Sequence, residues 1–131
     1  MICLLDTHVL DWAQNAVHRL SPKVRDLIQR ARPGELAVSD TSLPELARHL
    51  VTGKIKVPIQ SDVWLEAAIA DVVVLPVTPA IALRAARLDC DNRDLCDRHM
   101  IATAVVHKLP LLTIDERIHA LVGVRGLKVI W

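Results

Sequence analysis

Residues 2–15 read ICLLDTHVLDWAQN, and this stretch contains the pattern that the rest of the chain repeats. Its first part, residues 2–6, is a short apolar run that ends in an acid, Asp6. Its second part, residues 7–15, has the composition of a helix. An apolar run without alternating polar residues is typical of a strand that is covered on both faces. The stretch therefore predicts one strand followed by one helix.

The same alternation continues to the end of the chain. Further strands are expected at residues 34–39, 72–78, 110–115 and 127–131, and further helices at residues 22–32, 42–54, 61–70, 79–88 and 97–108. Ser21 is the expected N-cap of the helix that follows it, Pro79 stands at the start of another helix, and Gly53 stops a third. The pattern predicts a single α/β domain over residues 1–131, a three-layer sandwich with a mainly parallel sheet of about five strands.

The composition narrows the classes of ligand. About half of the 131 residues are apolar (52%), but the aromatic side chains number three Trp, with no Phe and no Tyr. This scarcity counts against a surface that stacks nucleotide bases, and the Trp residues are expected in packing or interfaces. The net charge is +1, so a nucleic-acid binder of this kind would need a local basic patch or metal ions.

Nothing in the sequence predicts a secreted or membrane protein. The first residues lack the basic region of a signal peptide and include an acid at position 6. No apolar run reaches the roughly 18 residues that a membrane span requires. Cys3, Cys90 and Cys96 are odd in number and lack the pairing of a zinc site. We expect reduced thiols in a cytoplasmic protein, with Cys3 in the core.

Four acids fall where such a sheet would hold a ligand, beyond the carboxyl ends of its strands. Asp6 ends the first strand, and Asp115 follows PLLTI at the end of the strand 110–115. Glu45 lies in the first turn of the helix after residues 34–39, and Asp97 opens the helix 97–108. Four carboxylates at one edge would repel each other at pH 7, which a divalent cation with oxygen ligands would relieve. Since no His or Cys spacing indicates zinc, the expected ion is Mg²⁺ or Mn²⁺.

Taken alone, most of these acids have a structural explanation. Asp97 could simply begin a helix, where its charge meets the positive end of the helix dipole. Glu45 could complete a capping box with Ser42, and Asp115 could lie in a solvated turn. Asp6 is harder to explain in this way, because it directly follows a buried strand. The four together favour a shared site, since chance gives no reason for all of them to lie at strand ends.

Over nearly its whole length, the chain resembles the PIN-domain family, and within it the VapC-type toxins of bacterial toxin–antitoxin pairs. The segment LLDTHVLDW (4–12) is similar to the motif that carries the first acid of the family. Residues 38–57 resemble the segment with the second acid, and residues 82–118 resemble the third and fourth motifs. The terminal GVRGLKVIW (123–131) is similar to the usual closing strand. Four motifs in order, at ordinary spacing, make this resemblance specific.

The resemblance implies a metal-dependent endoribonuclease that hydrolyses RNA phosphodiester bonds to 5′-phosphate and 3′-hydroxyl ends. Asp6, Asp97 and Asp115 would hold one or two Mg²⁺ or Mn²⁺ ions. Glu45 would bind metal through water or orient the nucleophile. Thr113 could contact Asp6 or a metal-bound water, and its structural alternative is an ordinary β-branched strand residue.

Further residues are expected around these ligands. Asp94 is expected behind the metal ligands or in a loop beside them. Phosphate contacts would come from the cations nearest to the acidic motifs in the sequence, Arg98, Arg93, Lys54 and Lys56. Each of these cations could instead be a solvated surface charge.

The resemblance also implies protein partners, and it leaves an alternative function open. A cognate VapB-like antitoxin would cover the acidic site, and a homodimer would use the helix 22–32 or the helix 42–54. The alternative is a non-catalytic PIN-like binding module that acts through a protein partner. A receiver-like domain is disfavoured, because the strand 72–78 ends without an acceptor acid. Where relatives often have Asp-Pro-Phe-Asp-Arg, this chain has DLCDR (94–98), a change that bears on the loop rather than on the carboxylates.

Overall fold

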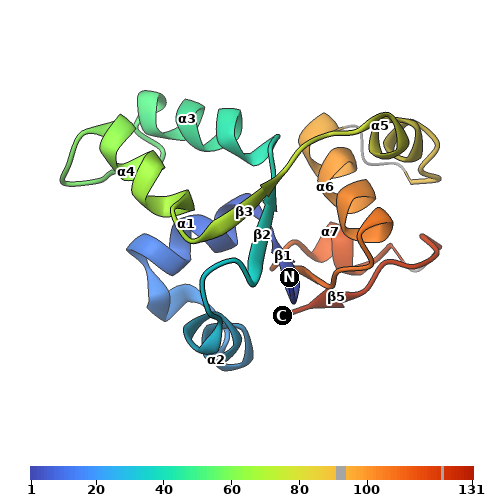
Figure 1. The fold of residues 1–131 in the computed structure, drawn as a ribbon, viewed down its shortest axis with the longest axis horizontal. Helices are drawn as coiled ribbons and strands as arrows, with labels where there is room; N and C mark the ends of the chain where they lie inside the picture. Colours follow the sequence, from blue (N-terminus) through green and yellow to red (C-terminus); the bar gives the residue numbers. More distant parts are fainter. Residues whose placement is uncertain (91–93, 122) are drawn as a thin grey trace.

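A five-stranded parallel sheet lies at the centre of the computed structural model, which describes residues 1–90, 94–121 and 123–131 (Figure 1). The strand order is β3-β2-β1-β4-β5. The strands are β1 (Cys3–Leu5), β2 (Leu36–Ser39), β3 (Val72–Leu75), β4 (Leu111–Leu112) and β5 (Val129–Ile130). This arrangement confirms the predicted fold class and the position of every predicted strand, although each strand is shorter than its apolar run.

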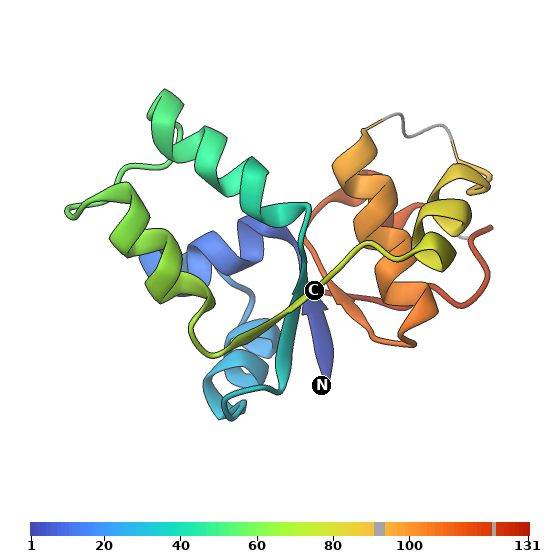
Figure 2. The ribbon, with the colours of Figure 1, turned by 45° about the horizontal axis from the view of Figure 1, so that its top comes forward.

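Helices cover both faces of the sheet, as Figures 1 and 2 show. On one face lie α1 (Thr7–Asn15), α2 (Pro22–Arg30), α3 (Ser42–Thr52) and α4 (Ser61–Ile69). On the other face lie α5 (Pro79–Ala86), α6 (Leu95–Val106) and α7 (Glu116–His119). The short 3₁₀ helix η1 (Val17–Arg19) joins α1 to α2, and neither η1 nor α7 was predicted. Each is too short to show a hydrophobic period in the sequence.

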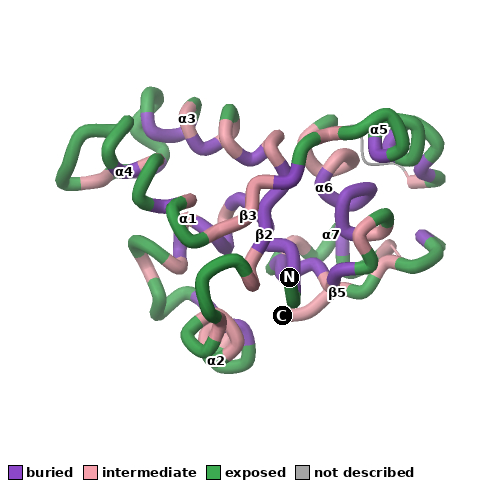
Figure 3. The backbone as a smooth tube through the Cα atoms, in the orientation of Figure 1, coloured by how far each residue is buried: buried purple, intermediate pink, exposed green. Residues whose placement is uncertain are grey.

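Consecutive side chains of a strand point to opposite faces of the sheet, and since helices cover both faces, the central strands β1, β2 and β4 are buried and the edge strands β3 and β5 are half-buried. Cys3 and Leu5 pack in the core beneath α1–α4, whereas Leu4 between them packs in the core beneath α6 and α7. Figure 3 shows buried segments along the central strands β1 and β2 and exposed segments on the outer turns. Continuous apolar runs, rather than alternating ones, are what such a sheet requires.

The ends of the helices confirm some of the predicted caps and correct others. Ser21 accepts a hydrogen bond from the Val24 amide and caps α2, as expected. The helix 97–108 was placed too late, because α6 begins at Leu95 and Asp94 is its N-cap, accepting from the Asp97 amide at 3.1 Å. Asp97 therefore lies in the first turn of α6 and does not open it.

The capping box at the start of α3 was also wrong. The N-cap of α3 is Thr41, and Ser42 is the first helical residue. The Ser42 hydroxyl is buried and accepts a hydrogen bond from the Thr7 hydroxyl at 3.0 Å. Ser42 thus joins α1 to α3 instead of capping Glu45, which leaves Glu45 available for contacts outside its own helix. Gly53 ends α3 in the left-handed conformation (φ 77°), as predicted.

Two further findings concern burial and membrane spans. All three cysteines are free, and Cys3 is buried in the core as predicted. Trp12 and Trp64 are buried, and the Trp12 and Trp131 rings pack edge to face.

Within residues 1–90, 94–121 and 123–131, no helix combines the length and the apolar character needed to cross a membrane.

Candidate metal centre

The four predicted acids line one cleft at the carboxyl edge of the sheet, which we name the acid cleft. Its volume is about 350 Å³. Its lining residues are Asp6, His8, Glu45, Arg48, His49, Lys54, Asp94, Asp97, Ile114, Asp115 and Arg117. Four separate segments of the chain supply the acids: the ends of β1 and β4 and the first turns of α3 and α6. The parallel strands bring these segments together, because their carboxyl ends meet at one edge.

Asp6 lies at the bottom of this cleft. It directly follows β1 and is 6% exposed. Its Oδ2 accepts a hydrogen bond from the Thr113 hydroxyl at 2.5 Å. Thr113 is the residue that directly follows β4. Burial raises the pKa of the Asp6 carboxyl, and the Thr113 hydrogen bond opposes that rise. The predicted contact between Thr113 and Asp6 is therefore confirmed, and Thr113 is not merely a strand residue.

Glu45 is contacted by side chains from two other helices. The Cys96 thiol donates to Glu45 Oε2 at 2.7 Å, and the Thr7 hydroxyl lies 3.3 Å from the same oxygen. Cys96 is one of the residues by which DLCDR (94–98) departs from the motif that the chain resembles, and its side chain makes this polar contact. Burial and the neighbouring Glu45 raise the pKa of the Cys96 thiol. The thiol consequently stays protonated and acts as a donor.

Asp97 and Asp115 share a cation from the chain itself. Arg117 binds Asp115 through two of its nitrogens, with Nη2 2.8 Å from Oδ2 and Nε 3.2 Å from Oδ1. The same Nη2 lies 3.8 Å from Asp97 Oδ2. The Arg117 hydrogen bond lowers the pKa of the Asp115 carboxyl, partly opposed by burial. Arg117 thus lies where it neutralises two of the four acids.

The other predicted residues are divided between the cleft and its surroundings. Asp94 and Lys54 line the acid cleft, whereas Lys56 is exposed and is not part of its lining. Arg98 does not reach the cleft, because its guanidinium binds the carbonyl oxygens of Ala85, Leu88 and Cys90 at the end of α5. Arg93 lies outside the described residues.

The donor chemistry of the cleft suits Mg²⁺ or Mn²⁺, which prefer carboxylate oxygens. The side chains are not arranged as a ready-made site, since among the described residues no three His, Cys, Asp or Glu side chains gather closely enough to hold a metal ion. Their oxygens are turned instead to protein donors: Asp6 to Thr113, Glu45 to Cys96, and Asp115 to Arg117. A bound cation would have to displace the Arg117 guanidinium from Asp115, but it could bind Asp6 and Glu45 through the oxygens that do not accept from Thr113 and Cys96.

Five lining residues were not predicted as parts of the site: His8, Arg48, His49, Ile114 and Arg117. His8 follows Thr7 in the first turn of α1, and Arg48 and His49 lie one turn after Glu45 on α3. The helical spacing from Glu45 could have indicated Arg48 and His49, because residues three and four apart share a face. The only sequence signal for Arg117 is its place two residues after Asp115.

Comparisons with known proteins give a consistent result. The family model described as PIN domain matches residues 3–123. The chain is 34% identical over 118 residues to Ribonuclease VapC22 of Mycobacterium tuberculosis (strain ATCC 25618 / H37Rv), covering 89% of each chain. The structure is similar to VapBC-5 of Mycobacterium tuberculosis, a member of the VapBC family of toxin–antitoxin systems, with a TM-score of 0.66, 25% identity and coverage of 98% and 97%. It is also similar to FitAcB of Neisseria gonorrhoeae, with a TM-score of 0.72, 19% identity and coverage of 100% and 97%.

Proposed function

Because this chain belongs to the PIN domain family, we propose that it is a metal-dependent endoribonuclease and the toxin of a toxin–antitoxin pair. The relative with the highest identity quoted above is named a ribonuclease, and the two chains match over 89% of their lengths. The observation that carries the proposal is the meeting of four acids, from four separate segments, in one cleft at the carboxyl edge. Asp115 caps α7 and Asp97 lies in the first turn of α6, but these local roles do not explain why both acids meet Asp6 and Glu45 in one cleft.

Asp6, Asp97 and Asp115 would hold one or two Mg²⁺ or Mn²⁺ ions, and Glu45 would bind metal through water. The metal would lower the pKa of a bound water and neutralise charge on the scissile phosphate. The chain would prepare this site in two ways. Thr113 keeps Asp6 oriented, and its hydrogen bond favours the charged carboxylate that a cation requires. Arg117 balances Asp97 and Asp115 until the metal arrives.

Glu45 is the residue best placed to orient the attacking water, since the Cys96 thiol donates to its Oε2 and the Thr7 hydroxyl lies against the same oxygen. In-line attack would leave a 5′-phosphate and a 3′-hydroxyl. Lys54 and Arg48 line the same cleft and would contact phosphates of the RNA strand. These cations supply locally the positive charge that the whole molecule, with a net charge of +1, lacks.

The same proposal includes protein partners and a place in the cytoplasm. Solved relatives are described as VapBC toxin–antitoxin complexes, and we expect a VapB-like antitoxin to cover the acid cleft of this chain. A homodimer would use the exposed apolar residues on and after α3, where Val51 is 85% exposed, Val63 55% and Ile59 49%. These residues belong to α3, to α4 and to the turn between them.

Cleavage of a pool of total RNA tests the activity. The purified protein would be incubated with Mg²⁺ or Mn²⁺ and, separately, with EDTA, beside the variants Asp6→Ala and Asp62→Ala. Asp62 is an exposed acid at the start of α4, outside the acid cleft, and serves as the matched control. We expect cleavage that requires metal, disappears in Asp6→Ala, persists in Asp62→Ala and leaves 5′-phosphate ends.

The outcomes separate the proposal from its alternatives. Cleavage in EDTA, or equal cleavage by Asp6→Ala, would indicate a contaminant or a different mechanism. A folded protein, free of antitoxin, that cuts no RNA in the pool would instead support the non-catalytic binding module. Far-UV circular dichroism and urea unfolding of each variant would establish that any loss of activity is not a loss of folding.

A further inference from the structure

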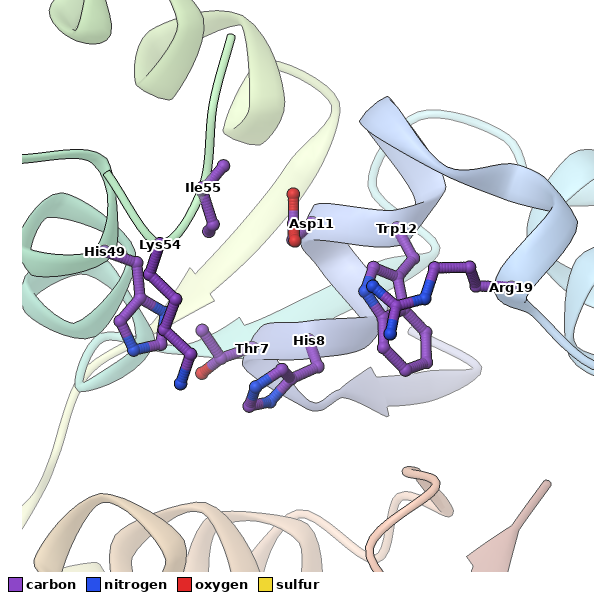
Figure 4. Close-up of a pocket in the computed structure, with 8 residues that line it drawn as sticks. All are labelled: Thr7, His8, Asp11, Trp12, Arg19, His49, Lys54 and Ile55. Carbon is purple, nitrogen blue, oxygen red and sulfur yellow. The ribbon is translucent and has the colours of Figure 1, made fainter. Parts of the chain in front are cut away.

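A second, smaller pocket adjoins the acid cleft, and we name it the side pocket. Its volume is about 190 Å³, and its walls include His8, Trp12, Arg19, His49, Lys54 and Ile55. Figure 4 shows His49, Lys54 and Ile55 on one side and Trp12 and Arg19 on the other, with His8 between them. The volume lies below the roughly 300–1,000 Å³ of pockets that take a whole drug-sized ligand, so it suits a single flat ring.

The side pocket contains a planar cation held against an aromatic ring. The Arg19 guanidinium lies 4.2 Å from the centre of the Trp12 ring, and the buried Trp12 also packs edge to face against His8 and Trp131. These contacts hold the indole in place, and the indole holds the guanidinium. Arg19 is exposed, so its plane is accessible from the solvent side. Guanidinium planes stack on unpaired nucleobases in proteins that bind single-stranded RNA.

The side pocket and the acid cleft are continuous. His8, His49 and Lys54 line both of them. A base in the side pocket would therefore belong to a nucleotide next to the phosphate in the acid cleft, with the exposed Lys54 ammonium beside the linking phosphate. Desolvation by burial lowers the pKa of His49, which favours the neutral imidazole in the wall between the side pocket and the acid cleft.

We propose that the side pocket binds one nucleobase of single-stranded RNA, on the nucleotide adjoining the scissile phosphate, with the Arg19 guanidinium as its stacking plane. This inference rests on the ribonuclease function proposed above and adds a base subsite to it. The scarcity of aromatic residues counted against base stacking in the sequence. Here a guanidinium supplies the plane, and a buried Trp fixes its position.

Binding without cleavage tests the subsite separately from the activity. Fluorescence anisotropy in EDTA would give the Kd of a short unstructured oligoribonucleotide and of a series in which one base at a time is removed. The proteins would be the wild type, Arg19→Gln, Arg19→Lys and the control Arg30→Gln. Arg30 is an exposed arginine on α2 that pairs with Asp26 and lies outside both pockets. Trp12 is not varied, because it is buried in the core.

Stacking of one base predicts about a tenfold weaker Kd in Arg19→Gln and an unchanged Kd in Arg30→Gln. Arg19→Lys would lose most of the same affinity, because it keeps the charge but not the plane. Removal of the base at one position of the oligonucleotide would weaken binding to the wild type by a similar factor and would add little in Arg19→Gln.

Two results would overturn the subsite. In the first, Arg19→Lys binds like the wild type and base removal acts equally in all proteins, which would make Arg19 a phosphate contact. In the second, Arg19→Gln weakens binding of a VapB-like antitoxin while RNA binding is unchanged, which would assign the side pocket to that partner. The cleavage assay reports independently on the function. If base removal and Arg19→Gln weaken RNA binding non-additively, as predicted, but no RNA is cut, the nuclease is rejected and the subsite stands. If RNA is cut but the effects of base removal and Arg19→Gln are independent, the subsite is rejected and the nuclease stands.

Discussion

The hydrogen bond from Thr113 to Asp6 gives the most specific test of how the fold prepares its carboxylates. Valine has nearly the same shape as threonine but no hydroxyl, so Thr113→Val removes the donor with little change in packing. Both residues are buried, with Thr113 0% and Asp6 6% exposed, and water has little access to replace the lost bond. The second bond of the hydroxyl, from the Asp115 amide at 3.1 Å, involves a half-buried group that can turn to solvent.

The expected loss follows from these contacts. A hydrogen bond to a charged group contributes about 1.5–3 kcal/mol, so the free energy of unfolding of Thr113→Val should fall by about that amount at pH 8. The bond favours the charged form of Asp6 and opposes the rise in its pKa that burial causes. The pKa of Asp6 should therefore rise further in the variant. The difference in stability should shrink as the pH falls and the carboxyl becomes protonated in both proteins.

Urea unfolding at pH 8 and pH 5 measures this loss, and Thr103→Val is the matched control. Thr103 is equally buried, but its hydroxyl donates at 2.7 Å to the His99 carbonyl within the same helix. Hydrogen bonds from a Thr hydroxyl to a carbonyl of the same helix contribute little to stability. The free energy of unfolding of Thr103→Val should therefore stay within about 0.5 kcal/mol of that of the wild type. Equal losses in both variants, or a loss in Thr113→Val that does not depend on pH, would refute the reasoning.

Three more predictions concern the same cleft. Burial disfavours the charged Asp6 carboxylate, so the metal-free wild type loses stability as the pH rises through the raised pKa of Asp6. Asp6→Asn should remove this loss, and it should therefore raise the urea midpoint more at pH 8 than at pH 5. A urea midpoint of Asp6→Asn below that of the wild type at pH 8 would contradict this prediction. Arg117→Gln should tighten Mn²⁺ binding about two- to fivefold, because it removes a guanidinium that competes with the metal for Asp97 and Asp115. Electron paramagnetic resonance would measure the binding, and unchanged or weaker binding would count against this competing role of Arg117. Cys96 and Cys3 should react with iodoacetamide at pH 8 far more slowly in the folded protein than in urea, because burial raises the pKa of both thiols, that of Cys3 to about 12. Peptide mapping by mass spectrometry would follow the reaction, and fast labelling of folded Cys96 would mean that its contact with Glu45 is not maintained.

Much of the fold was predictable because helices cover both faces of the sheet, so that the central strands β1, β2 and β4 are buried and the edge strands β3 and β5 are half-buried. Strands that are covered on both faces require apolar runs, and these runs alternate with helical segments in the order that a parallel sheet demands. The carboxyl-edge rule then placed Asp6, Glu45, Asp97 and Asp115 together without any knowledge of their distances. The short elements η1 and α7 escaped prediction, since three or four residues carry no period.

The site was less predictable wherever its geometry depends on contacts between distant residues. Ser42 reads as a helix cap in the sequence, but its hydroxyl is used by Thr7, 35 positions earlier. Arg98 is near the acids in the sequence, yet the carbonyls at the end of α5 draw its guanidinium away from them. Arg117, in contrast, was not predicted but belongs to the site. It lies in the one-turn helix α7, which the sequence does not reveal, and there its side chain contacts Asp115 and Asp97.

The central claim is that four carboxylates from separate segments hold one catalytic cation site. Anomalous scattering from crystals of the Mn²⁺-loaded protein tests it most directly. We predict an anomalous difference peak in the acid cleft, within bonding distance of Asp6 and of Asp97 or Asp115, with the Arg117 guanidinium turned away from the two acids that it bridges without metal. A peak elsewhere on the protein, with Arg117 still bound to Asp115 at a saturating concentration of Mn²⁺, would contradict the account.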